Sequence, residues 1–154
     1  MKKYLPHLFF TMLALAIGYI SNIIQGVSMA EWYPTIAKAP LTPPGIVFAI
    51  VWPVLYILMG ISAGIMWNKR SIYTWLVLLL YLLQLGLNLA WSFCFFTLQS
   101  PASGLVVLSL LIVAVVMYAT MAYHMKKSAG IMNVPYILWL LFALYMNAYV
   151  VLYN

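Results

Sequence analysis

Five long apolar runs constrain what this chain can fold into more than any other feature of its sequence. Each run is about as long as the roughly 20 residues that a helix needs to cross the hydrocarbon core of a bilayer. Hydrophobic residues make up 68% of the 154 residues and charged residues only 5%, which is too little polar surface for a soluble globule. The runs do not alternate as barrel strands do. They cover residues 6–29, 46–67, 72–98, 102–124 and 131–153.

These runs predict an all-α integral membrane protein, a five-transmembrane-helix bundle that forms one domain over residues 1–154, with residues 30–45 as a loop. Basic residues predict its orientation, because they are enriched in cytoplasmic loops. On one side of the membrane Lys38 is the single basic residue. We therefore expect a multi-pass protein of the cell membrane with its N-terminus inside and its C-terminus outside. The basic residues of the predicted inner side are Lys2, Lys3, Lys69, Arg70, Lys126 and Lys127.

Aromatic side chains gather on one face in three of the predicted helices, and in two of these helices amide side chains share that face. Polar residues within a span usually face the bundle or a cavity, whereas lipid-facing positions need only be apolar. A cavity walled by indoles, phenols and a few amides suits a large, flat, mostly apolar ligand. The alternative is that the amides are hydrogen-bonding contacts between helices and the tryptophans are packing or interfacial residues. The residues on these faces are Phe48, Trp52 and Tyr56 in the second run, Gln84, Asn88 and Trp91 in the third, and Tyr136, Trp139, Ala143 and Asn147 in the fifth.

Two small residues lie on roughly the opposite face of the third run. Gly86 and Ala90 are four residues apart, a spacing that lets two helices approach closely. This pair predicts either the interface of a homodimer or close packing within one chain.

The scarcity of acidic residues excludes several classes of function. The chain has one, Glu31, so it lacks the carboxylate pair of acid–base hydrolases and an acidic proton relay within a span. His7 and His124 lie near helix ends without the partners of a metal site. The basic residues come in pairs at helix ends, which does not indicate nucleic-acid binding. We expect no metal and no permanently bound cofactor, so a ligand must bring most of any chemistry.

Four ordered motifs resemble those of the TspO/MBR family of tryptophan-rich sensory proteins, which includes the mitochondrial translocator protein. Residues 32–44 resemble the family's WY-x-x-L-x-K-P-x-x-x-P-P loop, with Ile36 and Ala39 as departures. Residues 52–60 match W-x-x-LY-x-x-MG, residues 84–96 match QL-x-LN-x-x-W-x-x-x-FF, and residues 135–147 match PY-x-x-W-x-x-FA-x-x-LN with Met146 in place of the last Leu. The likeness covers nearly the whole chain.

The resemblance implies a five-helix bundle, usually a homodimer, that binds tetrapyrroles such as protoporphyrin IX. It also implies binding of benzodiazepine-type and isoquinoline carboxamide ligands. Bacterial relatives are linked to light-dependent breakdown of bound porphyrin, which needs light and oxygen, and Trp52 and Trp139 are the expected photochemical residues. The alternatives are a transporter or shuttle of tetrapyrroles or lipids, and a porphyrin or stress sensor that acts through a partner. Residues expected to shape the ligand site are Tyr33, Tyr56, Asn88, Trp91, Ala143 and Asn147.

The loop at residues 30–45 is predicted to be a stiff lid over the cavity. It holds four of the eight prolines, which fix φ and lower the cost of ordering the chain. We expect Trp32 and Tyr33 to point toward the ligand and Lys38 to meet a propionate at the rim. Pro43 and Pro44 would set the start of the second helix. The alternative is an interfacial linker with an aromatic anchor.

Overall fold

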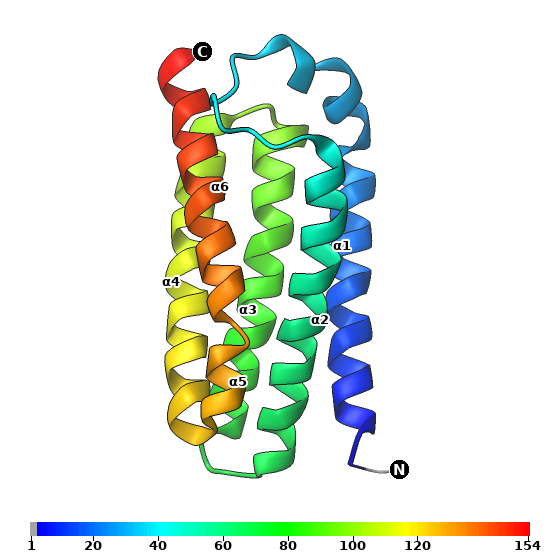
Figure 1. The fold of residues 1–154 in the computed structure, drawn as a ribbon, viewed down its shortest axis with the longest axis vertical. Coiled ribbons are helices and arrows are strands. Elements are labelled where there is room, and N and C mark those ends of the chain that lie inside the picture. The colour runs from blue at the N-terminus through cyan, green and yellow to red at the C-terminus, as the bar shows by residue number, and fades with distance from the viewer. Residues whose placement is uncertain (1–2) are drawn as a thin grey trace.

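The computed structural model describes residues 3–154 and consists of helices and connecting loops. Five helical segments are long and apolar enough to cross a membrane, which confirms the predicted all-α bundle of five spans. The described termini lie at opposite ends of the bundle, as an odd number of spans requires (Figure 1). Which end faces the cell interior stays a prediction. The elements are α1 (Leu5–Glu31), η1 (Tyr33–Thr35), α2 (Gly45–Lys69), α3 (Thr74–Ser92), η2 (Phe93–Thr97), α4 (Pro101–Met125), α5 (Lys127–Ile131) and α6 (Val134–Tyr153).

The helix ends follow from local sequence. Pro44 has an extended backbone and precedes α2, while Arg70 ends that helix in the left-handed region at φ 48°. At α4, the Ser100 side chain accepts a hydrogen bond from the backbone N–H of Ser103, and Pro101 fills the first position, where no N–H is needed. Helix α1 continues through Glu31, so the first loop comprises residues 32–44.

The fifth predicted run, residues 131–153, corresponds to α6, and a short helix that the sequence did not predict, α5, precedes it. Pro135 has no N–H to bond back to the preceding turn, and α5 and α6 are separated at Met132 and Asn133. The Asn133 side chain compensates by donating to the carbonyl of Ala129 at 2.8 Å and to Ser62 Oγ at 3.0 Å. The break therefore lies inside protein, where both hydrogens of the Asn133 amide find acceptors.

Glycines set how closely α1 and α2 approach. A Cβ atom at Gly60 would overlap the backbone of Thr11, and one at Gly64 would overlap that of His7. The GxxxG pair of α2 is therefore used within one chain. By contrast, Gly86 is exposed on α3 with no atom within 4 Å of an added Cβ, and Ala90 nearby is half-buried.

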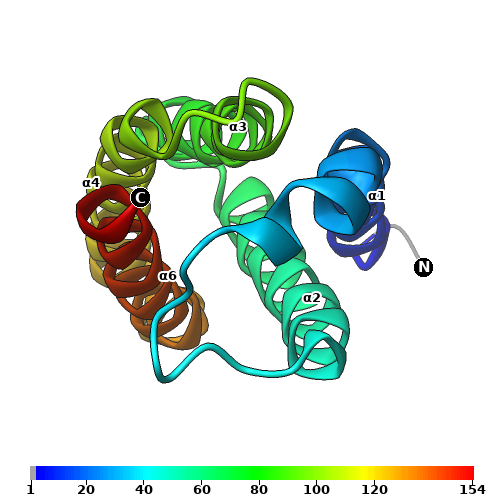
Figure 2. The ribbon, with the colours of Figure 1, turned by 90° about the horizontal axis from the view of Figure 1, so that it is seen from above.

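The first loop crosses the end of the bundle that also holds the described C-terminus. Seen from above, it runs from α1 toward α6 and then returns to α2 (Figure 2). The space beneath it is bordered by α2, α3 and α6, which carry the aromatic residues singled out in the sequence. The end of α3 winds into the wider π-helical turn η2, which brings Phe95 and Phe96 under this loop.

Candidate functional site

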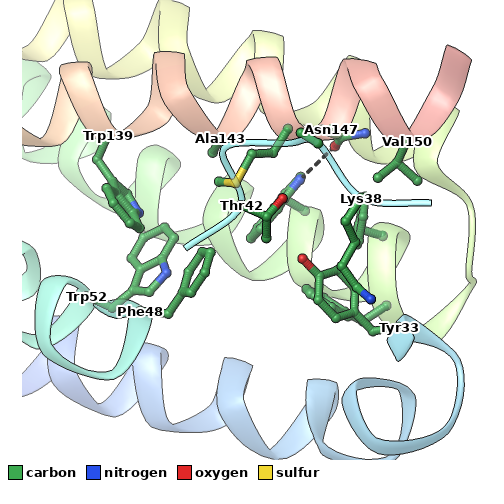
Figure 3. A pocket seen from close by; sticks show the side chains of 14 residues that line it. Tyr33, Lys38, Thr42, Phe48, Trp52, Trp139, Ala143, Asn147 and Val150 are labelled. Carbon is green, nitrogen blue, oxygen red and sulfur yellow. Dashed lines mark hydrogen bonds between the residues drawn. The ribbon is translucent and has the colours of Figure 1, made fainter. Parts of the chain in front are cut away.

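A cavity lies beneath the loop and contains about 50 Å³ of space. Its walls are almost wholly apolar, since indole and phenyl rings form most of them. Figure 3 shows Phe48, Trp52 and Trp139 at one end of the cavity, and Tyr33, Lys38 and Val150 at the other. The lining residues come from the loop (Tyr33, Lys38, Ala39, Thr42), from α2 (Phe48, Trp52), from α3 and η2 (Trp91, Phe95, Phe96) and from α6 (Trp139, Ala143, Met146, Asn147, Val150).

Trp52 is the hub of an aromatic cluster at the deep end of this cavity. Its ring centroid lies 6.4 Å from that of Trp91, nearly parallel, and 6.4 Å from that of Trp139, nearly perpendicular. On its other side Trp52 stacks on Tyr56 at 5.6 Å and meets Tyr136 at 6.3 Å. Such offset and edge-to-face pairs hold aromatic rings in fixed orientations.

Hydrogen bonds fix the polar residues around this cluster. The Trp91 Nε1–H donates to Asn147 Oδ1 at 3.1 Å, and Asn147 Nδ2 donates to the carbonyl of Pro101 at 2.8 Å (Figure 3 shows the first bond). One layer further from the loop, Tyr56 donates to Asn88 Oδ1 at 2.9 Å, and Asn88 Nδ2 donates to the Tyr136 hydroxyl at 3.2 Å. These amides therefore join helices through hydrogen bonds, which is the alternative interpretation of the sequence.

The indole N–H of Trp139, unlike that of Trp91, makes no hydrogen bond within residues 3–154. Its Nε1 atom is buried. A buried donor without a partner is costly, because it has lost its bond to water. The Trp139 indole is therefore a wall residue with a buried, unused donor to offer to a ligand.

The loop rests on the cavity through aromatic contacts. Trp32 packs edge-on against Phe95 at 5.6 Å, and Tyr33 packs against Phe96 at 5.8 Å. Lys38 Nζ lies 5.2 Å from the centre of the Tyr33 ring and donates to the carbonyl of Pro34 at 3.4 Å. Burial raises the pKa of the Tyr33 phenol, so this ring stays neutral beside the Lys38 cation.

Eight of the fourteen predicted catalytic and ligand-binding residues line the cavity, and six do not. Tyr56 and Asn88 lie one layer behind the wall, and Gln84 is fully buried with neither amide atom bonded to any of residues 3–154. Trp32 lies over Phe95, and Pro43 and Pro44 lead into α2, outside the lining. The eight are Tyr33, Lys38, Phe48, Trp52, Trp91, Trp139, Ala143 and Asn147.

Six lining residues were not among the predicted ones. Met146 and Val150 continue the α6 face of Ala143 and Asn147 at helical spacing, so the periodicity could have found them. Phe95 and Phe96 end the third motif, and Phe95 continues the stripe of Trp91 at helical spacing, so the sequence did carry a signal for this part of the wall. Ala39 and Thr42 are loop residues whose position depends on how the loop crosses the bundle. No group of three His, Cys, Asp or Glu side chains within residues 3–154 could hold a metal ion.

The fold and the cavity together define a class, namely a helical multi-pass membrane protein with an aromatic cavity closed by a proline-rich loop at one end. The sequence model of the TspO/MBR family matches residues 10–153 of this chain. The chain belongs to the TspO/MBR family.

Relatives within this family cover most of the chain. A protein named Tryptophan-rich protein TspO from Archaeoglobus fulgidus is 37% identical over 91% of this chain and 91% of its own length. A protein of the same name from Chlorobaculum tepidum is 35% identical over 88% of this chain and 87% of its own. The Translocator protein of Bos taurus is 30% identical over 94% of this chain and 87% of its own. Family membership supports a ligand-binding role within the membrane.

Proposed function

We propose that this protein binds a tetrapyrrole such as protoporphyrin IX in the cavity beneath the loop and promotes its photooxidative breakdown. The observation that carries the proposal is the contact of Trp52 with both Trp91 and Trp139 at the cavity wall. Three indoles around one apolar space offer flat, electron-rich surfaces to a flat, apolar macrocycle. The family's known ligands point to the same class of molecule.

Polar groups at the cavity suit the few polar atoms of such a ligand. Lys38 is the single charged residue of the lining, and its side chain lies at the loop end, where a propionate could meet it. At the deep end, the unused Trp139 N–H can donate to an acceptor. The macrocycle would then lie between these two positions, along the aromatic walls.

The proposed chemistry depends on light and on the ligand. A bound porphyrin that absorbs light passes energy to oxygen, and the reactive oxygen attacks the macrocycle. Trp52 and Trp139 would be the wall indoles that take part, and each can give one electron to an oxidising species and form an indole radical. The protein supplies binding, orientation and these two indoles, and the ligand supplies the rest.

The binding of a tetrapyrrole requires the cavity to expand. Pockets for ligands of drug size or larger measure roughly 300–1,000 Å³, whereas this cavity has about 50 Å³. The helices that wall it are packed against their neighbours, so the loop is the element best placed to move. Bound and free protein should therefore differ most at residues 32–44.

The test is a titration with protoporphyrin IX in the dark, followed by absorbance under illumination. Saturable binding and faster loss of the porphyrin bands than in detergent alone are expected. Trp52→Phe/Trp139→Phe should keep binding within a few-fold and slow the loss about tenfold or more. The matched control is Trp67→Phe/Trp75→Phe, a second indole pair in contact at 5.8 Å and remote from the cavity. It should behave like the parent.

The outcomes separate the alternatives. If the Trp52/Trp139 variant destroys porphyrin at the parent rate, the photochemical role of these residues is refuted. Saturable binding without faster loss would leave a carrier or a sensor, and flux in proteoliposomes would then separate those two. Competition by a benzodiazepine-type or isoquinoline carboxamide ligand would place that ligand class in the same cavity.

We further propose that the chain forms a homodimer through the exposed face of α3. Gly86 offers open space on this face, and Ala90 lies one turn away. Gly86→Leu should shift the protein from dimer to monomer in size-exclusion chromatography with light scattering. A parent protein that is monomeric at all concentrations would refute the proposal.

A further inference from the structure

The side chain of Asn154 joins the first loop to the end of α6. Its Oδ1 accepts a hydrogen bond from the backbone N–H of Ala37 at 2.8 Å, and its Nδ2 donates to the carbonyl of Ala37 at 3.2 Å. The same Nδ2 donates to the carbonyl of Val150 at 3.0 Å. Both hydrogens of the amide and one of its acceptor sites are therefore used in one arrangement.

We propose that Asn154 is a positioning residue that holds the loop closed over the cavity and thereby sets how fast a ligand enters and leaves. The pair of hydrogen bonds between Asn154 and Ala37 is called the latch below. The kinetic part of this proposal rests on the proposed function of the cavity, whereas the closing of the loop by the latch does not.

The latch is placed where it controls the part of the loop that covers the cavity. Ala37 directly precedes Lys38 and Ala39, which both line the cavity, and Ala39 is buried. Pro34 and Pro40 flank this segment and limit its backbone freedom. The latch binds both backbone polar groups of Ala37, and because the prolines on either side have little freedom, it fixes the segment from Pro34 to Pro40.

The loop's other attachments lie elsewhere. The aromatic contacts of Trp32 and Tyr33 tie the start of the loop to η2. The Lys38 side chain bonds back to Pro34, within the loop itself. The latch is the hydrogen-bonded link between the loop and α6, which carries Asn147 and Val150 of the cavity wall. Opening the latch would release the middle of the loop while its start stays attached.

If a ligand enters and leaves the cavity through the loop, its passage must open the latch. The cavity's space of about 50 Å³ is well below the roughly 300 Å³ of a small ligand pocket. If the latch closes the free and the bound protein alike, its loss should raise the association and dissociation rates together. The equilibrium affinity should then change little.

The decisive variant is Asn154→Ala, with Thr35→Ala as its matched control. Asn154 is exposed at the end of α6, so the substitution leaves no cavity in the core. Thr35 is exposed too and donates a 2.7 Å hydrogen bond to the carbonyl of Trp32, but that bond lies within the loop. Both variants therefore remove a loop hydrogen bond, and one of them removes the latch.

The first readout needs no ligand. Hydrogen–deuterium exchange in detergent micelles should show the Ala37 amide exchanging about tenfold faster in Asn154→Ala than in the parent, since its acceptor is gone. Thr35→Ala should leave exchange at Ala37 within about twofold of the parent. Equal exchange at Ala37 in the parent and in Asn154→Ala would overturn the latch.

The second readout is stopped-flow binding of protoporphyrin IX in the dark. Asn154→Ala should raise both rate constants about three- to tenfold and leave Kd within about twofold, whereas Thr35→Ala should match the parent. Faster exchange with unchanged rate constants would overturn the kinetic role of Asn154. If the parent itself binds no porphyrin, the proposed function fails, and the exchange measurement still decides whether Asn154 holds the loop.

Discussion

The two halves of the bundle solve the packing of apolar helices in different ways. In the half near α5, which we call the closed half, glycines bring α1 and α2 into backbone contact and a buried polar network joins α2, α4 and α5. In the half beneath the loop, which we call the cavity half, large aromatic rings keep the helices apart. Small residues thus serve packing, and large flat residues make a space that the protein's own side chains do not fill.

The polar network of the closed half is centred on the Ser62 hydroxyl. Ser62 donates to the carbonyl of Ala129 at 2.9 Å, so the hydroxyl of Tyr118 must donate to Ser62 Oγ at 2.9 Å. The same oxygen also accepts from Asn133 Nδ2. Two buried groups have no partner within residues 3–154, namely Asn133 Oδ1 at the edge of this network and the indole N–H of Trp139 in the cavity half. Trp139 lines the cavity and Asn133 does not, so the indole is the one of these two groups that a ligand in the cavity could reach.

The largest expected effect comes from adding a methyl group where backbones touch. Gly60→Ala should lower the free energy of unfolding by about 2–3 kcal/mol, because the new Cβ forces α1 away from α2. The measurement is reversible unfolding in mixed micelles. Gly26→Ala is the control, since an added Cβ there meets nothing within 4 Å. If the Gly60→Ala protein is as stable as the Gly26→Ala protein, helices are not packed more closely in the closed half than in the cavity half.

The next effect tests the polar network of the closed half. Asn133→Ala should cost about 1–2 kcal/mol of stability, because the Ala129 carbonyl and Ser62 each lose a hydrogen bond. Porphyrin affinity should stay at the parent value, since Asn133 lies outside the cavity. Asn22→Ala, at an exposed position of α1, is the matched control and should be neutral. Weaker porphyrin binding in Asn133→Ala would mean that the two halves are coupled.

In the cavity half, a larger side chain should act on binding more than on stability. Ala143→Leu fills part of the cavity and should weaken porphyrin binding about tenfold, or about 1.4 kcal/mol. The melting temperature should change little, because the added atoms occupy existing space. Ala148→Leu on the same helix, outside the lining, is the control. Dark titration with protoporphyrin IX and thermal unfolding measure the two quantities, and an undiminished affinity would place the ligand elsewhere.

The smallest effect concerns the charge at the rim. Lys38→Gln should weaken porphyrin binding two- to threefold, within the 0.2–1 kcal/mol of an exposed ion pair, and should reduce its salt dependence. Titrations at low and high salt measure both. Protoporphyrin IX dimethyl ester serves as the control ligand, because it lacks the carboxylates. If the ester loses affinity as much as the free acid does, the role of Lys38 is not electrostatic.

Much of this architecture follows from the sequence, because the thickness of the membrane fixes the length of each span. Helical periodicity placed Trp52, Trp91 and Trp139 on inward faces, and all three line the cavity. Periodicity gives the direction of a side chain around its helix but not its depth along the bundle. Gln84 and Asn88 share the stripe of Trp91, yet they lie too deep to reach the cavity.

Contacts between distant segments were beyond sequence reasoning. Ala37 and Asn154 are 117 residues apart in sequence, and nothing in either segment indicates the pair. The GxxxG of α2 was visible as a pattern, but its partner helix could not be read from it. The short helix α5 was not predicted either, because it lies almost wholly outside the apolar run of residues 131–153.

The cluster of indoles around Trp52 also has an optical consequence. The electronic transitions of Trp52 couple to those of Trp91 and Trp139, whose ring centroids each lie 6.4 Å away. The near-ultraviolet circular dichroism of the cluster therefore depends on how the rings are oriented to one another. Any rearrangement of the cavity wall would change this signal before a coloured ligand is added. The protein thus carries its own chromophore for the state of its cavity.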